Sequence, residues 1–214
     1  MSNFLKRLFT SIALVGLVGG MWLYTSPCIT SLFLCIVACY TLLFEWPKFH
    51  YWWLTPLYPV MPFVLLIAFN SSPYRTELLW LLCIAIVHDS AAYVVGNLIG
   101  AHKLWPRVSP GKTWEGTIGG VVSSLIVSWM LLPSLVYEKS MLLRFTPLHY
   151  LVVALLVNIA CVLGDLFESW LKRRAHLKDS GCILPGHGGV LDRLDSLFGA
   201  IVMWTGIHFF IKQF

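Results

Sequence analysis

A polar segment between two long apolar stretches contains the residues best suited to chemistry. Residues 169–195 read SWLKRRAHLKDSGCILPGHGGVLDRLD, a run rich in lysine, arginine, aspartate and glycine. Cationic side chains bind phosphate oxygens, glycines let backbone N–H groups approach them, and neighbouring carboxylates hold a divalent ion. The segment therefore predicts a site for phosphate and a metal ion at a membrane surface.

Acidic residues continue this pattern into the apolar stretch before it. Asp165, Glu168, Ser169 and Lys172 are spaced i, i+3, i+4 and i+7, so a helix places them on one face. A carboxylate at bilayer depth is costly, which raises the question of a functional role for Asp165 and Glu168; for Glu168 we favour a structural role. The structural alternative for Asp165 is an ion pair with Lys172 or Arg173 that only fixes helix packing.

Two further aspartates, Asp192 and Asp195, lie three residues apart where the last apolar stretch begins. Mg²⁺ typically takes one or two protein carboxylates together with water and substrate phosphates. With Asp165 on the preceding helix, these residues predict a metal site built from two helix ends. Asp89 is a further acid in an apolar window, and a polar contact between helices competes evenly with a functional role for it.

The basic segment HKLWPRVSPGKTWEG, residues 102–116, offers more donors for phosphate or a lipid headgroup: Arg107, Ser109 and Lys112. Its Gly-Lys-Thr triplet is not a P-loop, because Pro106 stands where that motif requires its first glycine. Ordinary charge bias of cytosolic loops would explain the cations, but not the expected turn over residues 109–112. We therefore favour substrate binding.

The composition is that of an integral membrane protein of the all-α class. Hydrophobic residues make up 58% and charged residues 12% of the 214 residues, and the mean hydropathy is +0.77. Soluble domains average about 45–50% and about 25%. Apolar windows of about 17–25 residues can cross about 30 Å of hydrocarbon as helices. We expect about seven such helices, at residues 8–25, 28–46, 51–69, 78–100, 117–137, 148–171 and 194–212.

The basic residues predict the orientation. When the loops between the windows are assigned alternately to two sides, one side collects most of the lysines and arginines, and this side is expected to be cytoplasmic. The N-terminus then lies in the cytoplasm and the C-terminus on the opposite side. The cytoplasmic set is Lys6, Arg7, Lys48, Lys103, Arg107, Lys112, Lys172, Arg173, Arg174, Lys178 and Arg193, against Arg75, Lys139, Arg144 and Lys212.

The order of residues in the polar segment closely resembles the signature of the phosphatidate cytidylyltransferases, also called CDP-diglyceride synthases. That signature reads S-x-[apolar]-K-R, four residues, K-D-x-G, then L-P-x-H-G-G-x-x-D-R-x-D, and the spacing here is unchanged. A second stretch, from Asp89 to Tyr93 and from Arg107 to Gly116, also resembles the family. The signature positions are Ser169, Lys172, Arg173, Lys178, Asp179, Gly181, Leu184, Pro185, His187, Gly188, Gly189, Asp192, Arg193 and Asp195.

The resemblance implies a Mg²⁺-dependent enzyme of phospholipid biosynthesis that makes CDP-diacylglycerol and pyrophosphate from CTP and phosphatidate. It implies Asp165 and Asp192 as the first metal ligands and Asp195 as the third, and it allows a monovalent cation such as K⁺ nearby. It also implies a homodimer in contact with bilayer lipid and no nucleic acid. The expected catalytic residues are Asp165, Lys172, Arg173, Lys178, Asp179, His187, Asp192 and Arg193, and the expected substrate-binding residues are Arg107, Ser109, Lys112, Gly188, Gly189 and Asp89.

Individual roles follow from charge and size. The four cations Lys172, Arg173, Lys178 and Arg193 can offset the charge of a triphosphate, and the glycine pair 188–189 permits close approach of the backbone. For His187 we favour binding of a phosphate oxygen over proton transfer, because a phosphate monoester is already ionised near neutral pH.

Two other functions remain open from the sequence. One is another CTP-dependent membrane enzyme, a kinase-like protein acting on a lipid alcohol. The other is an ion-coupled transporter, although a transporter does not require the ordered cytosolic cluster of lysine, histidine, glycine and aspartate. A CDP-alcohol phosphotransferase is less favoured, because its D-G-x-x-A-R pattern is absent from the sequence.

We expect a single membrane domain over residues 1–214. It would comprise N-terminal spans at 1–77 and a catalytic half at 78–214, which carries cytosolic loops at 101–116 and 172–193. A nucleotide triphosphate is a cytosolic substrate. We therefore expect the chain in the bacterial inner membrane, also called the cytoplasmic membrane, with the active site facing the cytosol.

Overall fold

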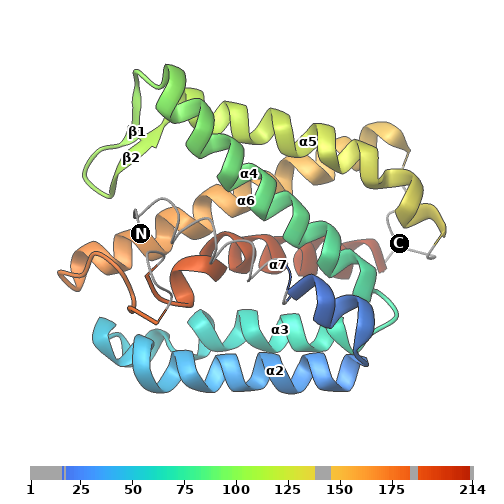
Figure 1. The fold of residues 1–214 in the computed structure, drawn as a ribbon, viewed down its shortest axis with the longest axis horizontal. Coiled ribbons are helices and arrows are strands. Elements are labelled where there is room, and N and C mark those ends of the chain that lie inside the picture. The colour runs from blue at the N-terminus through green and yellow to red at the C-terminus, as the bar shows by residue number, and fades with distance from the viewer. Residues whose placement is uncertain (1–15, 17, 138–145, 184–187, 213–214) are drawn as a thin grey trace. The chain divides into compact units, whose positions relative to one another are not determined.

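The structure, a computed structural model, describes residues 16, 18–137, 146–183 and 188–212, most of them in helices (Figure 1). The chain divides into two compact units. Unit 1 comprises Met1–Ser72 and Leu171–Leu194, and unit 2 comprises Pro73–Trp170 and Asp195–Phe214. The polar segment thus groups with the N-terminal part of the chain, and each unit is described by itself.

Unit 1 contains a long apolar helix that changes its winding. Helix α2 (Pro27–Tyr40) begins after Ser26, whose hydroxyl accepts a hydrogen bond from the N–H of Ile29, and proline occupies its first turn. It continues as a π-helix over Thr41–Glu45 and a 3₁₀ helix over Trp46–Phe49. None of the residues of α2, all of them described, is buried, as expected for a helix whose apolar sides face lipid.

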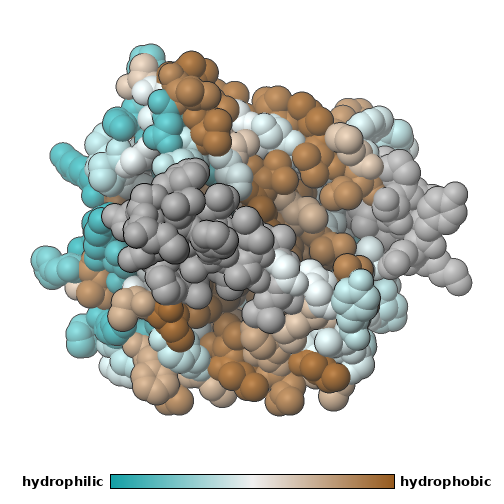
Figure 2. All heavy atoms as spheres, viewed as in Figure 1, coloured by the Kyte–Doolittle hydropathy of each residue, from teal (hydrophilic) through white to brown (hydrophobic). Residues whose placement is uncertain are grey.

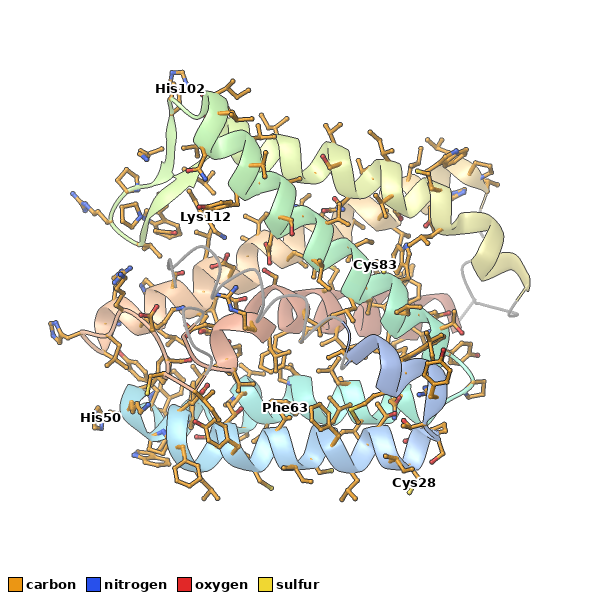
Figure 3. All side chains as sticks on the ribbon, in the orientation of Figure 1. Cys28, His50, Phe63, Cys83, His102 and Lys112 are labelled. Atoms are coloured by element: carbon orange, nitrogen blue, oxygen red, sulfur yellow. The ribbon has the colours of Figure 1, made fainter. Side chains whose placement is uncertain are left out.

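A second helical segment, which follows α2 in the chain, completes the core of unit 1. It consists of short helices at Trp52–Leu54 and Pro56–Val60 followed by α3 (Met61–Asn70). Asn70 Nδ2 donates to the carbonyl oxygen of Pro27 at 2.8 Å, which ties the end of α3 to the start of α2. Phe63, which projects from α3, is 2% exposed, and Trp46 is 1% exposed (Figure 3). Close packing of these rings stabilises this core, because the rings gain dispersion contacts that lipid chains would not give them in fixed positions.

Unit 2 contains four long helices. They are α4 (Arg75–Ile99), α5 (Trp114–Tyr137), most of α6 (Pro147–Arg174) and most of α7 (Leu191–Lys212). Helices α4 and α5 lie side by side, and hydrophobic side chains gather over them on the face shown in Figure 2.

Glycines allow the helices of unit 2 to pack closely. A Cβ at Gly116 of α5 would lie 2.6 Å from the carbonyl oxygen of Ala92 in α4. At the α6–α7 crossing, a Cβ at Gly199 would overlap the carbonyl oxygen of Ala160. Small residues at helix contacts are typical of membrane helices, because packing rather than hydrophobic exclusion holds these helices together.

Buried polar side chains also link the helices of unit 2. Trp80 of α4 donates through Nε1 to Ser128 of α5 and Tyr150 of α6, each at 2.8 Å. His88 Nδ1 lies 3.1 Å from Oδ1 of Asn158. Each of these five buried side chains has a hydrogen-bond partner on another helix, so the contacts hold the helices together.

Residues 103–113 of the basic segment form a short antiparallel hairpin, and the turn expected over residues 109–112 is wrong. Strands β1 (Lys103–Trp105) and β2 (Ser109–Thr113) pair with Lys103 opposite Thr113 and Trp105 opposite Ser109. The Ser-Pro-Gly-Lys residues therefore form strand β2, and the chain reverses before them, where the N–H of Val108 donates to the carbonyl oxygen of Trp105 at 3.1 Å. Hydrophilic side chains gather around this hairpin (Figure 2). Most of the other described residues are helical, as predicted.

Within the residues that the structure describes, four helical segments are long and apolar enough to cross a membrane: Pro27–Phe49, Trp52–Asn70, Arg75–Ile99 and Pro147–Arg174. They match the windows expected at 28–46, 51–69, 78–100 and 148–171. Helices α5 and α7 cover the windows at 117–137 and 194–212 but do not reach the same criterion within the described residues. Half of the first window, residues 8–15 and 17, lies outside the described residues.

Candidate functional site

In unit 1 a lysine and an aspartate of the polar segment form a buried ion pair. Lys172 Nζ donates to Oδ1 of Asp192 at 2.6 Å, and the two side chains are 10% and 6% exposed. Lys172 comes from the last turn of α6 and Asp192 from the first turn of α7. The structural alternative for Asp165 was an ion pair with Lys172 or Arg173. Within unit 1, Lys172 instead forms its ion pair with Asp192.

The second oxygen of Asp192 accepts three further hydrogen bonds. The donors are the N–H and the hydroxyl of Ser180, both at 2.9 Å, and the N–H of Gly189 at 2.8 Å. Burial alone would raise the pKa of Asp192, but the charge and hydrogen bond of Lys172 and these N–H groups outweigh it, so its pKa is lowered. Asp192 is therefore a fixed anion at neutral pH.

The glycine pair has a structural reason in unit 1. Gly188 has a φ of 83°, a left-handed conformation that side chains rarely adopt. Gly189 is buried, and a Cβ there would collide with the hydroxyl of Ser180 and lie 2.7 Å from Oε1 of Glu45. These contacts explain the glycines within the protein, and the expected approach of a phosphate to them stays a prediction.

The other predicted residues of the polar segment are at the surface of unit 1. Arg173, Lys178, Asp179 and Arg193 are exposed. Arg173 Nη1 also donates to the carbonyl oxygen of Leu177 at 3.3 Å. Exposed cations can reach a ligand from solvent. His187 lies outside the described residues, so its predicted role stays a prediction.

In unit 2 the hairpin supplies a lysine to the acidic face of α6. The side chain of Lys112 extends from β2 toward α6 (Figure 3), where its Nζ pairs with Oδ2 of Asp165. Ser169 Oγ donates to Oδ1 of Asp165 at 3.2 Å. The i, i+4 neighbours Asp165 and Ser169 thus share a helical face, as predicted, and Glu168 on the same helix is buried. Lys112 contacts Asp165 from strand β2.

A polar clasp closes the hairpin. The N–H of His102 donates to Glu115, and His102 Nδ1 lies 2.6 Å from Glu115 Oε1. The hydrogen bond with His102 lowers the pKa of Glu115 to about 2. Thr113 Oγ1 accepts from the N–H of Gly116 and so caps α5. The clasp orients the strand that carries Ser109, which is half-buried, and Lys112, while Arg107 is exposed at the reversal.

Asp195 and Asp89 are linked through one serine of α7. Asp195 is 7% exposed, and its Oδ1 accepts from the N–H of Ser196 at 2.8 Å. The hydroxyl of Ser196 donates to Oδ1 of Asp89 at 3.3 Å. For Asp89, the structural alternative to a functional role was a polar contact between helices, and this hydrogen bond is such a contact. The substrate-binding role of Asp89 stays a prediction.

Both aspartates ranked first as metal ligands therefore have a cationic partner, Asp165 in unit 2 and Asp192 in unit 1. Among the residues that the structure describes, no three His, Cys, Asp or Glu side chains gather closely enough to hold a metal ion alone. Mg²⁺ does not need such a cage, because water and substrate phosphates complete its coordination. Hard carboxylate oxygens at positions that already hold a cation fit this ion.

One residue of this region was missed by the sequence analysis. Glu45, at the end of the π-helix in unit 1, is fully buried and accepts hydrogen bonds from the N–H groups of Val190 and Leu191, each at 2.8 Å. Glu45 lies inside the apolar window 28–46. The criterion that selected Asp165 and Glu168, an acid at bilayer depth, would also have selected it.

Comparison with known proteins identifies the family and relatives of this chain. Residues 2–211 match the cytidylyltransferase family. The chain is similar to the phosphatidate cytidylyltransferase of Haemophilus influenzae, 38% identical over 146 residues, which are 67% of this chain and 50% of that protein. It is 49% identical over 108 residues to that of Staphylococcus haemolyticus, covering 50% of this chain and 39% of that protein. It is 41% identical over 128 residues to the phosphatidate cytidylyltransferase of Bacillus subtilis, covering 59% of this chain and 45% of that protein.

The chain spans half of the length of these relatives or less. The match to the family itself extends over nearly the whole sequence. The chain belongs to the cytidylyltransferase family.

Proposed function

We propose that this chain is a membrane enzyme that makes CDP-diacylglycerol and pyrophosphate from CTP and phosphatidate. The observation that carries the proposal is the Lys172–Asp192 pair, held within a segment that follows the family signature without a change in spacing. A buried anion beside a lysine, with further cations exposed nearby, is suited to a triphosphate and its divalent ion.

The reaction forms one bond and breaks one. An oxygen of the phosphatidate phosphate attacks the α-phosphorus of CTP. The bond from that phosphorus to the oxygen bridging to the β-phosphate breaks, and pyrophosphate leaves with the electron pair. The chain needs no covalent nucleophile for this step, because phosphoryl-type transfer depends mainly on positioning and on stabilising charge.

Asp165 and Asp192 are proposed as Mg²⁺ ligands, with Asp195 third. When bound, the ion neutralises phosphate charge and polarises the phosphoryl oxygens. The residues of the chain supply the rest. Arg173, Lys178 and Arg193, all exposed in unit 1, bind the leaving pyrophosphate.

The hairpin is proposed to bind phosphate as well. Ser109 and Lys112 share strand β2, and Lys112 already lies against a carboxylate in unit 2. A lysine in such a position can exchange one anionic partner for another at little cost in conformational entropy, because its side chain is already ordered. Gly188, Gly189, Asp179, His187 and Asp89 keep the binding or catalytic roles that the resemblance implies, and K⁺ near the divalent ion and a homodimer also rest on the resemblance alone.

The membrane arrangement is part of the proposal. Seven spans place the N-terminus and both motif segments, 101–116 and 172–193, in the cytosol, and the C-terminus on the other side. The basic residues support this orientation. CTP then reaches the site from the cytosol, phosphatidate reaches it from the bacterial inner membrane, and the four apolar helical segments agree with an integral membrane enzyme.

The test is pyrophosphate release by the purified full chain in lipid nanodiscs supplied with CTP. We expect release to require both Mg²⁺ and phosphatidate. Formation of CDP and a phosphorylated lipid from a polyprenol or diacylglycerol, with no pyrophosphate, would identify the kinase-like alternative and contradict the proposed reaction. No consumption of CTP under any of these conditions would contradict an enzymatic function and leave the transporter hypothesis to be tested.

A further inference from the structure

The N-terminal part of the chain contributes a buried carboxylate to the polar segment. The Glu45 side chain is 0% exposed and lies within unit 1. Its Oε1 accepts from the N–H of Val190 and its Oε2 from the N–H of Leu191, both at 2.8 Å. The first N–H groups of a helix have no partner within the helix, so Glu45 completes the start of α7 from outside.

A single hydroxyl connects Glu45 to Asp192. Ser180 Oγ lies 3.2 Å from Oε2 of Glu45 and 2.9 Å from Oδ2 of Asp192. The hydroxyl has one proton and can donate it to only one carboxylate at a time. The two acids are therefore coupled, and a change at Glu45 alters the hydrogen bonding of the carboxylate that we propose as a metal ligand.

The neighbouring backbone is fitted to Glu45. A Cβ at Gly181 would lie 2.6 Å from Oε1 of Glu45, and one at Gly189 would lie 2.7 Å from the same oxygen. Both glycines belong to the signature, and Gly189 also donates its N–H to Asp192. The turn thus contacts Glu45 on one side and holds Asp192 on the other.

A second residue of the same segment strengthens the contact. Lys48, three residues after Glu45, donates through Nζ to the carbonyl oxygen of Ser180 at 3.0 Å. Glu45 and Lys48 thus bind the hydroxyl and the carbonyl oxygen of the same serine. The π-helix and the 3₁₀ helix at the end of α2 place both side chains toward the polar segment.

We propose that Glu45 is a positioning residue: by holding the turn before α7 and the hydroxyl of Ser180, it orients Asp192 for the divalent ion and the nucleotide. This inference rests on the proposed function. Groups that orient metal ligands typically contribute about 10–100-fold to metal affinity or activity. The N-terminal segment is then part of the site and not only a membrane anchor.

The matched pair of variants is Glu45→Gln and Glu77→Gln. Glu77 is the control, because it is also 0% exposed and accepts a hydrogen bond, from Trp204 Nε1 at 2.9 Å, but it lies in unit 2 outside the proposed site. Glutamine keeps the shape of glutamate but can accept with one oxygen only, so it cannot serve both N–H groups of the turn.

Two readouts are taken from the full chain in nanodiscs. The first is the Kd of labelled CTP in the presence of Mg²⁺, measured by equilibrium dialysis. The second is hydrogen–deuterium exchange of the amides at 189–192. In Glu45→Gln we expect the Kd to rise about 10–100-fold and these amides to exchange faster. Glu77→Gln should leave the Kd and the amide exchange unchanged. The KM for phosphatidate, measured as a control, should stay the same in both variants.

A purely structural role predicts a different result, a smaller yield of folded Glu45→Gln with an unchanged Kd for CTP, and this would overturn the proposal. Should Glu45→Gln not fold, Ser180→Ala removes only the bridging hydroxyl. It should raise the Kd about tenfold, and an unchanged Kd there would likewise overturn it. If the unaltered chain binds no CTP, the proposed function fails. Unchanged amide exchange at 189–192 in Glu45→Gln would refute the claim that Glu45 stabilises the turn, whatever the Kd for CTP.

Discussion

The ammonium group of Lys172 lies 2.6 Å from Oδ1 of Asp192, and three other donors from Ser180 and Gly189 hold Oδ2. Both oxygens of this carboxylate therefore have hydrogen-bond donors that fix its orientation. A divalent ion that binds Asp192 meets a carboxylate whose orientation is already fixed, which lowers the entropic cost of binding.

Asp192→Asn is expected to abolish turnover and also to destabilise the protein. The substitution leaves Lys172 with an uncharged partner at a site where both side chains are at most 10% exposed, and breaking a buried pair costs about 3–5 kcal/mol. Thermal unfolding in detergent and CTP turnover measure the two effects. Near-normal activity would remove Asp192 as a ligand.

The double variant Lys172→Met with Asp192→Asn separates stability from chemistry. Replacing both partners of a buried pair by uncharged groups restores most of the lost stability. We expect the unfolding temperature to recover toward that of the unaltered protein while turnover stays absent. Recovery of turnover together with stability would mean that Asp192 serves the fold alone.

Asp165→Asn is expected to abolish turnover with little loss of stability. The Lys112–Asp165 pair is more open, with side chains 25% and 20% exposed, and pairs in contact with solvent contribute about 0–1 kcal/mol. The variant should therefore remain folded in the membrane, as judged by its unfolding temperature. An active Asp165→Asn protein would exclude this carboxylate from the metal site.

The sequence predicts contacts that depend on local spacing and misses those between distant segments. The i, i+4 relation of Asp165 and Ser169 follows from helical periodicity, and the structure confirms it. The contact of Glu45 with Leu191 joins residues 146 positions apart, and no periodicity within one helix can reveal such a pair. Only the cost of a buried acid gave a signal for Glu45.

The hairpin shows a second limit. Pro110 and Gly111 argue against a strand, since proline cannot donate to a sheet and glycine weakens it. The pairing of Lys103 with Thr113 and the clasp between His102 and Glu115 nevertheless hold these residues in β2. A two-stranded edge tolerates proline, and the local sequence signal was therefore overridden by contacts outside the strand.

Lys178→Ala is expected to weaken use of the nucleotide more than use of the lipid. A charge-assisted hydrogen bond to phosphate contributes about 1.5–3 kcal/mol, so the KM for CTP should rise at least about tenfold. Arg174→Ala is the matched control, because Arg174 is exposed on the same segment but falls at a variable position of the signature. An effect of Lys178→Ala confined to the KM for phosphatidate would contradict the assignment.

Tags at the two ends of the chain should report opposite faces of the membrane. Seven spans, an odd number, place the N-terminus in the cytosol and the C-terminus across the bilayer, and the distribution of lysine and arginine supports this orientation. Accessibility of each tag to a membrane-impermeant reagent in intact spheroplasts measures it. Finding both tags on one side would refute the count of seven.

The most direct measurement follows two radioactive labels of CTP in the reaction of the full chain with phosphatidate and Mg²⁺. Attack at the α-phosphorus predicts that label from the α-phosphate enters the lipid phase as CDP-diacylglycerol, while label from the γ-phosphate appears only in pyrophosphate. Transfer of the γ label to lipid would identify a kinase and contradict the account. A lipid phase that stays unlabelled with both α-labelled and γ-labelled CTP would also contradict it.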